Sequence, residues 1–214
     1  HRAKLSRVIY ASSSSVYGSN EESPFSEHHR VDSPISLYAA TKKANEVLAH
    51  AYFSLYGMEM VGLRFFTVYG TWGRPDLALF KFVKKIQQGK PVELYNRGKM
   101  VRCFTYVDDV VDSVIKIIEA PVRKRNELYN LGGSQAVSLM RFVELIEKNL
   151  GKKAQKKLMP MQPGDRAETL ANCSKAKRDF GHEPRTSVEE GISIFVEWFK
   201  ENEKFLLSLK EPKQ

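Results

Sequence analysis

A long helix-forming segment stands between two short apolar segments. Residues 37–56 are mostly Ala, Leu, Lys, Glu and aromatic residues without an internal Gly or Pro, and Gly57 stands where a glycine cap would end a helix. The flanking segments 6–11 and 58–66 have the length and apolar composition of buried strands. A strand, a long helix and a second strand in succession are typical of a parallel sheet that is covered by helices. We therefore predict an α/β fold.

The remaining chain continues to alternate between helical and extended patterns. Its 214 residues are enough for one large domain or two small ones. Residues 92–95 and 100–104 flank Asn96-Arg97-Gly98, which predicts a β-hairpin. Segments 21–34 and 159–172 have no regular pattern and are expected to be irregular. Further helices are predicted at 77–88, 107–119, 138–150, 174–180 and 187–209, and a short strand at 127–131.

The composition excludes several protein classes. Apolar residues make up 42% of the chain and charged residues 28%, as in ordinary soluble proteins. The longest apolar run is far shorter than the roughly 20 residues of a membrane helix, and no signal-peptide pattern is found. Cys103 and Cys173 have no spacing that indicates a zinc site or a disulfide framework. We therefore expect no metal, no membrane contact and a reducing, cytoplasmic location.

The net charge of +9 allows two interpretations. Basic residues gather at 123–125 and 152–157, which is compatible with nucleic-acid binding. The alternative is solvated charge on loops. Because neither cluster has interleaved aromatic residues, we favour the second interpretation and expect no nucleic-acid partner.

Tyr38 and Lys42 form the first candidate catalytic pair. Residues four apart lie on one face of a helix, roughly 6 Å apart along its axis. A phenol has a reference pKa of about 10, and a nearby ammonium group favours the phenolate. Such a pair can shuttle a proton to and from an alcohol. Because this spacing is frequent by chance, a surface lysine beside a half-buried tyrosine is the alternative.

Four consecutive serines, at 12–15, follow the first predicted strand. In a parallel sheet, the carboxyl end of a strand faces the crevice in which ligands bind. The serine hydroxyls are therefore expected to line a binding site.

Several motifs together resemble a known family. The chain resembles the extended short-chain dehydrogenases/reductases, and among them most closely the nucleotide-sugar 4-epimerases that act on UDP-glucuronate. The resemblance covers nearly the whole chain. The motifs are ASSSSVYG at 11–18, SLYAATKKANE at 36–46, LRFFTVYGTWGRPD at 63–76, RCFTYVDD at 102–109 and QPGD at 162–165 followed by SKA at 174–176.

This resemblance implies a fold and a catalytic centre. Residues 1–72 would form the C-terminal part of a Rossmann-type parallel sheet, and 73–214 a smaller mixed α/β substrate domain, with 126–134 returning to the sheet. The resemblance further implies NAD as the cofactor. Tyr38 would be the catalytic base, Lys42 would bind the nicotinamide ribose and lower the pKa of the tyrosine, and Ser13 would hold the sugar O4. Contacts with the cofactor are implied for Tyr38, Lys42, Phe65 and Ser12.

The family also implies how a UDP-sugar is held. Arg102 and Asp165 would bind the phosphate and ribose, and residues 94–96 would lie near the uracil. Thr67 and Arg74 stand as in the glucuronate enzymes, where a guanidinium grips the sugar carboxylate. Serine cannot replace the Asp-Glu acid/base pair of related 4,6-dehydratases, which disfavours a dehydratase. The implied substrate-binding residues are Ser14, Ser15, Thr67, Arg74, Leu94, Tyr95, Asn96, Arg102 and Asp165.

The chain also departs from the family pattern. Cys103 and Asn172 stand where Asp is usual, and Thr71 where Pro is common. No segment matches the Gly-rich turn that holds the cofactor pyrophosphate, so the chain is expected to begin about halfway through the Rossmann domain.

Three functions are compatible with these motifs. The first is C4 epimerisation of UDP-glucuronate to UDP-galacturonate through a 4-keto intermediate, and the second is the reaction of UDP-glucose 4-epimerase or of a related enzyme. The third is a non-catalytic nucleotide-sugar-binding or dimerising protein. The family further implies a homodimer formed through the helix that carries Tyr38.

Overall fold

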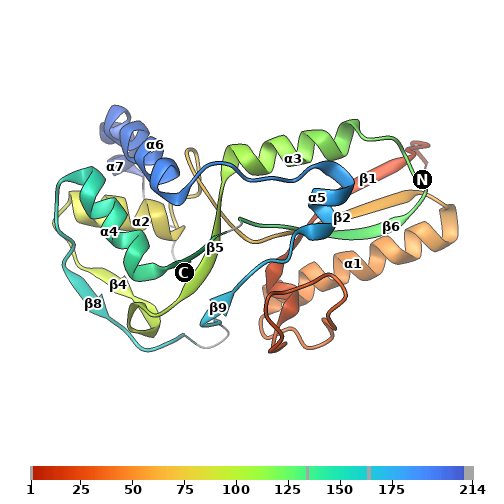
Figure 1. The fold of residues 1–214 in the computed structure, drawn as a ribbon, viewed down its shortest axis with the longest axis horizontal. Coiled ribbons are helices and arrows are strands. Elements are labelled where there is room, and N and C mark those ends of the chain that lie inside the picture. Colours follow the sequence, from red (N-terminus) through yellow and green to blue (C-terminus); the bar gives the residue numbers. More distant parts are fainter. Residues whose placement is uncertain (1, 134, 163–164, 210–214) are drawn as a thin grey trace.

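A three-stranded parallel sheet forms the centre of the first lobe. The computed structural model describes residues 2–133, 135–162 and 165–209. The strand order is β1 (Arg7–Ser13), β2 (Glu59–Phe65) and β6 (Asn126–Leu131). α1 (Leu37–Tyr56) covers one face of this sheet, and α3 (Val107–Glu119) and α5 (Ser174–Phe180) cover the other (Figure 1). The predicted α/β class and the Rossmann-type parallel sheet are confirmed.

Local signals set both ends of α1. The Ser36 hydroxyl accepts a hydrogen bond from the Ala39 N–H, which caps the first turn. Gly57 ends the helix with φ +63°, a left-handed conformation that glycine adopts without steric cost. The helix therefore has the predicted bounds.

The second lobe is a mixed α/β layer. β5 (Val101–Tyr106) pairs with β3 (Thr67–Tyr69), β7 (Ala136–Ser138) and β9 (Glu168–Thr169), and β4 (Val92–Leu94) pairs with β8 (Lys156–Leu158). The helices of this lobe are α2 (Ala78–Gln87), α4 (Leu139–Leu150), α6 (Val188–Glu201) and α7 (Glu203–Ser208). Short 3-10 helices lie at Ser14–Tyr17 and Tyr95–Gly98. Its core includes Phe80, Phe142, Phe195 and Phe199, each at most 2% exposed.

The predicted hairpin between residues 92 and 104 is wrong. β4 pairs in parallel with β8, whereas β5 belongs to the other sheet. Met159 N–H donates to Leu94 O, and Arg97 N–H donates to Met159 O, so a segment distant in the chain takes the edge of β4 that a hairpin partner would need. Asn96 and Arg97 have φ values of +49° and +52° and turn the chain out of the β4 direction.

The predicted C-terminal helix is divided in two. Asn202 has φ −109° and ψ 14°, outside the helical region, and separates α6 from α7. Its side-chain amide donates to Trp198 O, so the side chain competes with the backbone for a helical carbonyl. The segment 159–172, which was expected to be irregular throughout, also contributes β9.

The basic segment 152–157 takes part in ion pairs within the second lobe. Glu147 Oε1 lies 3.0 Å from Lys156 Nζ, and Glu147 Oε2 lies 3.5 Å from Lys153 Nζ. Lys157 Nζ lies 3.7 Å from Glu93. Within the described residues, no helix combines the length and apolar character that crossing a membrane requires. The same part of the chain contains no group of three or more His, Cys, Asp or Glu side chains suited to a metal.

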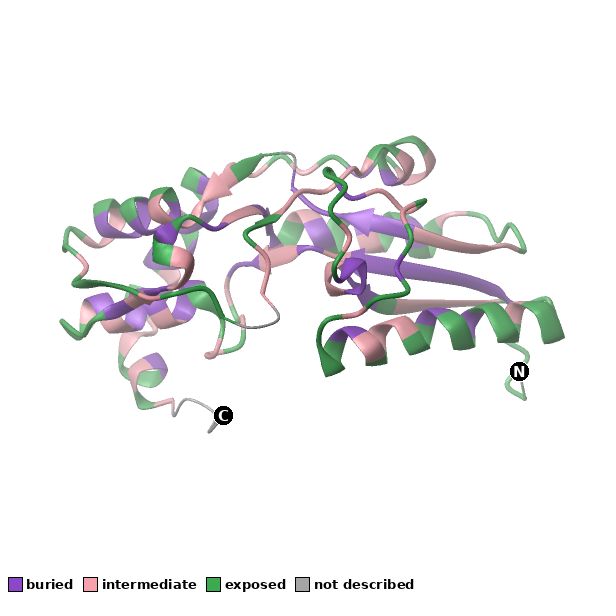
Figure 2. Ribbon diagram, turned by 90° about the horizontal axis from the view of Figure 1, so that it is seen from below, coloured by how far each residue is buried: buried purple, intermediate pink, exposed green. Residues whose placement is uncertain are grey.

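Figure 2 shows the central strand β2 buried along most of its length, while α1 exposes its outer face. The C-terminal end of the sheet points toward the second lobe, where β1 continues into the serine segment and β2 into β3 (Figure 1). The region between the lobes is therefore where the predicted site residues come together.

Candidate functional site

A polar crevice lies between the two lobes. Its inner part is a cavity of about 180 Å³, and an adjoining cavity of about 510 Å³ shares Thr67, Arg102 and Asp165 with it. The larger cavity extends to Tyr95 and Gln162. The inner part is lined by Ser14, Ser15, Gly18, Ile35, Ser36, Thr67, Arg102, Asp165, Arg166 and Thr169.

Arg102 and Asp165 form the charged wall of this crevice. Arg102 Nη2 donates to Asp165 Oδ1 at 2.9 Å and to Arg166 O at 2.7 Å. Burial lowers the pKa of the Arg102 guanidinium from its usual value, and Arg166 adds to this effect, whereas Asp165 opposes it. Two guanidinium groups and one carboxylate at one wall leave an excess of positive charge. An anionic group of a ligand is suited to that environment.

Tyr38 and Lys42 lie together in the first turns of α1. Lys42 Nζ donates to Ala11 O at 3.0 Å and lies 5.7 Å from the centroid of the Tyr38 ring. The tyrosine is 54% exposed, so its hydroxyl is accessible to a ligand. Ile35 and Ser36, directly before α1, line the inner cavity. Tyr38 follows Ser36 by two residues, but neither Tyr38 nor Lys42 is among the residues that line the two cavities.

The four serines have different surroundings. Ser13 Oγ accepts from the Ser15 N–H at 3.2 Å and lies 3.1 Å from Ser15 Oγ. Ser14 and Ser15 line the inner cavity. Ser12 is only 2% exposed, and its hydroxyl donates to Glu46 Oε1 at 2.7 Å. The crevice thus has several hydroxyls at the end of β1, while the Ser12 side chain is directed into the protein interior.

The sequence model of the NAD dependent epimerase/dehydratase family matches residues 1–132. The chain belongs to this family. It is 54% identical over 208 residues to an uncharacterized protein of Methanocaldococcus jannaschii, a match that covers 97% of this chain and 63% of the relative. It is 44% identical over 212 residues to a probable UDP-glucuronate 4-epimerase of Rhizobium meliloti. This match covers 91% of this chain and 62% of the relative.

A solved structure has a similar fold. The crystal structure of UDP-glucuronic acid 4-epimerase from Bacillus cereus, in complex with UDP-glucuronic acid and NAD, superimposes with a TM-score of 0.88 at 33% identity. The alignment covers 92% of this chain and 62% of that one. The chain thus spans 62% to 63% of the length of these three proteins.

In this epimerase/dehydratase family member, most predicted substrate residues line the crevice. The inner cavity contains Ser14 and Ser15, the outer cavity contains Tyr95, and both contain the shared residues Thr67, Arg102 and Asp165. Pro163 and Gly164 of the motif before Asp165 lie outside the described residues. These assignments remain predictions of ligand contact, but the fold does bring the side chains together.

Three predicted substrate residues lie elsewhere. Leu94 is fully buried in the core of the second lobe, and its carbonyl already accepts a bond from Met159 N–H. Asn96 lies in the turn after β4. The Arg74 side chain is 74% exposed, and Nη2 donates to Asp76 at 3.0 Å.

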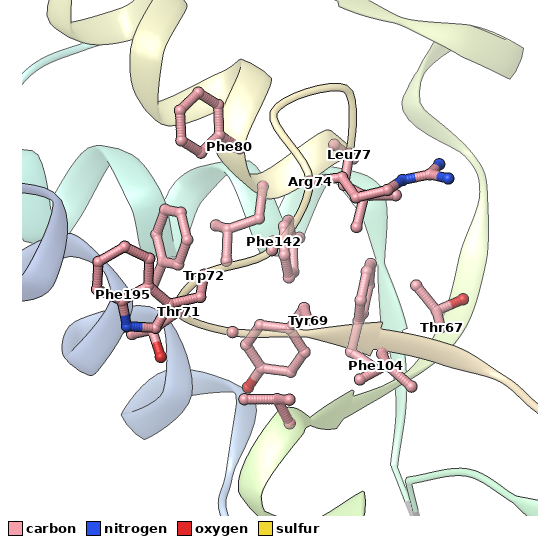
Figure 3. Close-up of a pocket in the computed structure, with 16 residues that line it drawn as sticks. Thr67, Tyr69, Thr71, Trp72, Arg74, Leu77, Phe80, Phe104, Phe142 and Phe195 are labelled. Atoms are coloured by element: carbon pink, nitrogen blue, oxygen red, sulfur yellow. The ribbon is translucent and has the colours of Figure 1, made fainter. Parts of the chain in front are cut away.

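Arg74 also lines a third cavity, which is mainly apolar. This cavity has a volume of about 410 Å³ and includes Thr67 of the crevice. Figure 3 shows the Arg74 guanidinium pointing away from the aromatic rings of the cavity, on the same side as Thr67. A contact between Arg74 and a ligand that also touches Thr67 remains a prediction.

The predicted cofactor residues fit the nicotinamide end of NAD in part. A lysine ammonium carries three N–H donors, and the bond to Ala11 O uses one of those of Lys42. The remaining donors, with the exposed Tyr38 hydroxyl, suit the vicinal hydroxyls of a ribose. Phe65 is partly buried among Val61, Leu63 and other side chains on the sheet face that α3 and α5 cover, and its cofactor contact stays a prediction.

Sequence reasoning missed a buried ion pair on the same helix as the predicted catalytic pair. Arg64 of β2 is 1% exposed and binds both carboxylate oxygens of Glu46 in α1, at 2.8 and 2.9 Å. The available signal was the position of Glu46 four residues after Lys42, which places it one helical turn further along the same face.

Arg166 was also missed. It follows the predicted Asp165, lines the inner cavity and donates to Gly18 O of the first lobe. Its guanidinium also lies 5.3 Å from the centroid of the Phe25 ring. Arg166 therefore connects the two lobes across the crevice.

Proposed function

We propose that the protein catalyses NAD-dependent epimerisation at C4 of a UDP-sugar, converting UDP-glucuronate to UDP-galacturonate. The observation that carries this proposal is the crevice that links Ser14 and Ser15, at the end of β1, to the Arg102–Asp165 pair and to Tyr95. A sugar, a diphosphate and a nucleoside follow one another in such a substrate. The proposal also draws on the Rhizobium meliloti relative, named a probable UDP-glucuronate 4-epimerase, and on the ligands of the Bacillus cereus structure.

In the proposed reaction, Tyr38 moves a proton at the C4 oxygen. Its phenolate takes the proton of the C4 hydroxyl, while the Lys42 ammonium stabilises the negative charge and the Ser13 hydroxyl holds the C4 oxygen. When bound, NAD supplies the hydride acceptor and donor at C4. The 4-keto sugar then turns within the crevice, so that hydride returns to its opposite face. Tyr38 finally gives its proton back to the C4 oxygen.

Two features favour UDP-glucuronate over other substrates. Arg74 offers a guanidinium near Thr67, and two parallel hydrogen bonds suit a carboxylate. Ser14 and Ser15 provide hydroxyls in the inner cavity in place of the acid/base pair that removal of water would need.

The direct test incubates the natural protein with NAD and UDP-glucuronate and detects UDP-galacturonate by proton NMR. UDP-glucose and dTDP-glucose serve as comparison substrates. We expect kcat/KM to be at least tenfold higher for UDP-glucuronate than for UDP-glucose. Preference for UDP-glucose would identify the second candidate, a UDP-glucose 4-epimerase, and loss of water from dTDP-glucose would contradict epimerisation.

A non-catalytic nucleotide-sugar-binding protein is the candidate from another class. The residues predicted to bind UDP, Arg102, Asp165 and Tyr95, line the crevice independently of Tyr38 and Lys42. A protein of this class would bind UDP without turning over any UDP-sugar. Calorimetric titration with UDP beside the NMR assay tests this, and detected turnover would overturn it.

We also propose a homodimer that forms through α1. The outer face of this helix exposes Val47, Leu48, Tyr52 and Leu55 by 44% to 71%. Contiguous apolar side chains at a surface are typical of protein interfaces. A second copy of the helix would bury them.

A further inference from the structure

Helix α1 rests on the sheet through few buried side chains. Of its 20 residues, those that are fully buried are Ala39, Glu46 and Ala49. The C-terminal half of the helix packs on an apolar cluster that contains Ala49, Phe53 and Met60. The N-terminal half, which carries Tyr38 and Lys42, is held by the small side chain of Ala39 and by the Glu46 carboxylate. Because a methyl group gives little directional contact, the position of the catalytic pair on the sheet depends mainly on what Glu46 binds.

Glu46 joins α1 to two strands at once. Arg64 Nε donates to its Oε1 at 2.8 Å and Arg64 Nη2 to its Oε2 at 2.9 Å, a two-point contact with β2. The Ser12 hydroxyl of β1 donates to Oε1 at 2.7 Å. Glu46, Arg64 and Ser12 are 6%, 1% and 2% exposed. The carboxylate thus sets the distance and the rotation of the helix relative to both strand ends.

The network is directly connected to the catalytic atoms. Ser12 lies between Ala11, whose carbonyl accepts the Lys42 hydrogen bond, and Ser13, the predicted partner of the sugar O4. Glu46 lies one turn after Lys42 on the same helix. A shift of the Glu46 carboxylate would therefore change the separation of Lys42 from Ala11 and of Tyr38 from Ser13.

Stability by itself does not account for this ion pair. Removing two charges from water is costly, and replacing a buried pair with well-packed apolar residues is often neutral or stabilising. The pair is also incompletely satisfied, since Arg64 Nη1 has no hydrogen-bond partner among the described residues. Its guanidinium lies 4.9 Å from the centroid of the Tyr17 ring. An ion pair with two parallel hydrogen bonds fixes the relative orientation of its two side chains, which an apolar contact does not.

We infer that Glu46 and Arg64 are positioning residues that hold Tyr38 and Lys42 in register with the serine hydroxyls at the end of β1. This inference rests on the proposed epimerase function. Misplacement of reacting groups by about 1 Å can lower the rate about 100-fold without changing which groups are present. The pair therefore controls kcat and has little effect on substrate affinity.

The principal test replaces both charges, in Glu46→Met/Arg64→Met. The double variant leaves no unpaired charge in the interior, so we expect thermal unfolding at or above the parental temperature. We also expect kcat for the UDP-sugar to fall about 10- to 100-fold, with KM changed less than twofold. If kcat stays above half the parental value, the positioning role is wrong.

Arg64→Lys is the second variant, which keeps the charge and loses the two-point contact. It remains informative if the double variant fails to fold. We expect this variant to have a lower kcat than the parent, with little change of KM. If Arg64→Lys has the parental kcat, the inference is wrong.

Glu59→Gln is the matched control. Glu59 is fully buried at the opposite end of the same sheet, where it pairs with Arg7 of β1 and lies 3.6 Å from Arg125. The Glu59→Gln substitution removes a buried carboxylate comparable to that of Glu46, but far from the crevice. We expect lower stability with parental kcat, and an equal loss of kcat in this control would show that general destabilisation is responsible.

A readout independent of turnover separates this inference from the proposed function. In protein labelled at the tyrosine ζ carbon, the ¹³C NMR signal of Tyr38, assigned with Tyr38→Phe, reports the surroundings of its hydroxyl without any turnover. A shift of α1 on the sheet moves Lys42 and Ala11 relative to Tyr38, so the signal position should change in Glu46→Met/Arg64→Met and stay unchanged in Glu59→Gln. An unchanged signal in both variants overturns positioning, even where no epimerisation is detected. Absence of epimerisation together with a changed signal in the double variant rejects the proposed function only.

Discussion

Arg102 and Asp165, far apart in the chain, meet in a 2.9 Å hydrogen bond between Nη2 and Oδ1 at the wall of the crevice. Arg102 lies on β5, which pairs with β9 through Thr169, so the sheet brings the segment around Asp165 to the arginine. The bond orients the guanidinium along the crevice. It also compensates a charge that burial disfavours.

The geometry of this pair leads to a prediction for nucleotide affinity. Arg102→Lys keeps the charge but loses the planar group that can bind two phosphate oxygens. We expect the Kd for UDP, measured by calorimetry, to rise about tenfold or more, which corresponds to at least roughly 1.4 kcal/mol. Arg178→Lys, on the exposed surface of α5, is the control and should bind UDP like the parent. Equal affinities in all three proteins would exclude Arg102 from the site.

Tyr38 is predicted to carry the proton at C4. In the natural protein, Tyr38→Phe should lower kcat about 10²- to 10⁴-fold and leave UDP-sugar affinity nearly unchanged, because acid–base groups contribute in that range. Tyr52→Phe removes a hydroxyl from the same helix and should retain parental turnover. Turnover above half the parental value in Tyr38→Phe is the result that would contradict the assignment.

Arg74 is predicted to recognise the sugar carboxylate. At present its guanidinium bonds to Asp76 in a largely exposed position, so it is available to a ligand at low cost. Arg74→Ala should reduce kcat/KM for UDP-glucuronate at least tenfold and that for UDP-glucose by less than threefold. Asp76→Asn should affect both substrates equally. A parallel loss for both substrates in Arg74→Ala would show that carboxylate recognition lies elsewhere.

The exposed face of α1 predicts the oligomeric state. A buried apolar interface cannot accommodate an unpaired carboxylate, so Leu48→Glu or Leu55→Glu should convert a dimer into a monomer in sedimentation velocity. Val111→Glu introduces the same charge on the exposed face of α3, where that side chain is 48% exposed, and should leave the dimer intact. A parental protein that sediments as a monomer at micromolar concentration would refute the interface.

His182 predicts a pH dependence of stability. Its Nδ1 lies 2.7 Å from Ser113 Oγ and its Nε2 3.0 Å from Gly132 O, in a position that is 2% exposed. Burial lowers the pKa of His182 from its usual value. Near pH 6.5 the unfolded chain therefore binds more protons than the folded one. The contribution of His182 to stability is fully present above the unfolded pKa and is lost progressively as the pH falls from there through the lower folded pKa.

The measurement compares unfolding free energies at pH 7.5 and pH 5.5. His182→Gln should destabilise the protein by about 1–3 kcal/mol at pH 7.5, because buried partners lose their bonds. It should also show a smaller decrease between the two pH values than the parent does. His28→Gln, at an exposed position, should keep the parental decrease, and an unchanged decrease in His182→Gln would show that other groups cause it.

Regular elements could be predicted where local chemistry determines them. The bounds of α1 follow from the Ser36 cap, from Gly57 and from the absence of Gly and Pro between them. α3 and α5 also have their predicted bounds. Gly181 ends α5 in the left-handed conformation, and Asp108 and Asp109 occupy the first turn of α3, so these signals are present in the sequence itself.

Pairing between distant segments could not be predicted in the same way. The apolar pattern of residues 92–104 was compatible with a hairpin. In the structure β4 pairs with β8 instead, because the packing of the second lobe brings β8 beside β4. The end of α6 likewise depends on a side-chain bond from Asn202 to Trp198 O that competes with a weak helical preference. Strand partners are chosen by packing over the whole lobe, and a local pattern does not contain that information.

The candidate site shows the same difference between local and long-range information. The sequence by itself determined which residue types could perform the chemistry, since Tyr38, Lys42 and the serines are recognisable from their spacing and from the motifs around them. Only the tertiary structure decided which of these side chains meet: it directs Ser12 to Glu46, buries Leu94 in the core and joins Glu46 to Arg64 across the sheet. The physical reason is that these contacts join residues separated by 18 or more positions, and their geometry exists only once the sheet and the helices have packed.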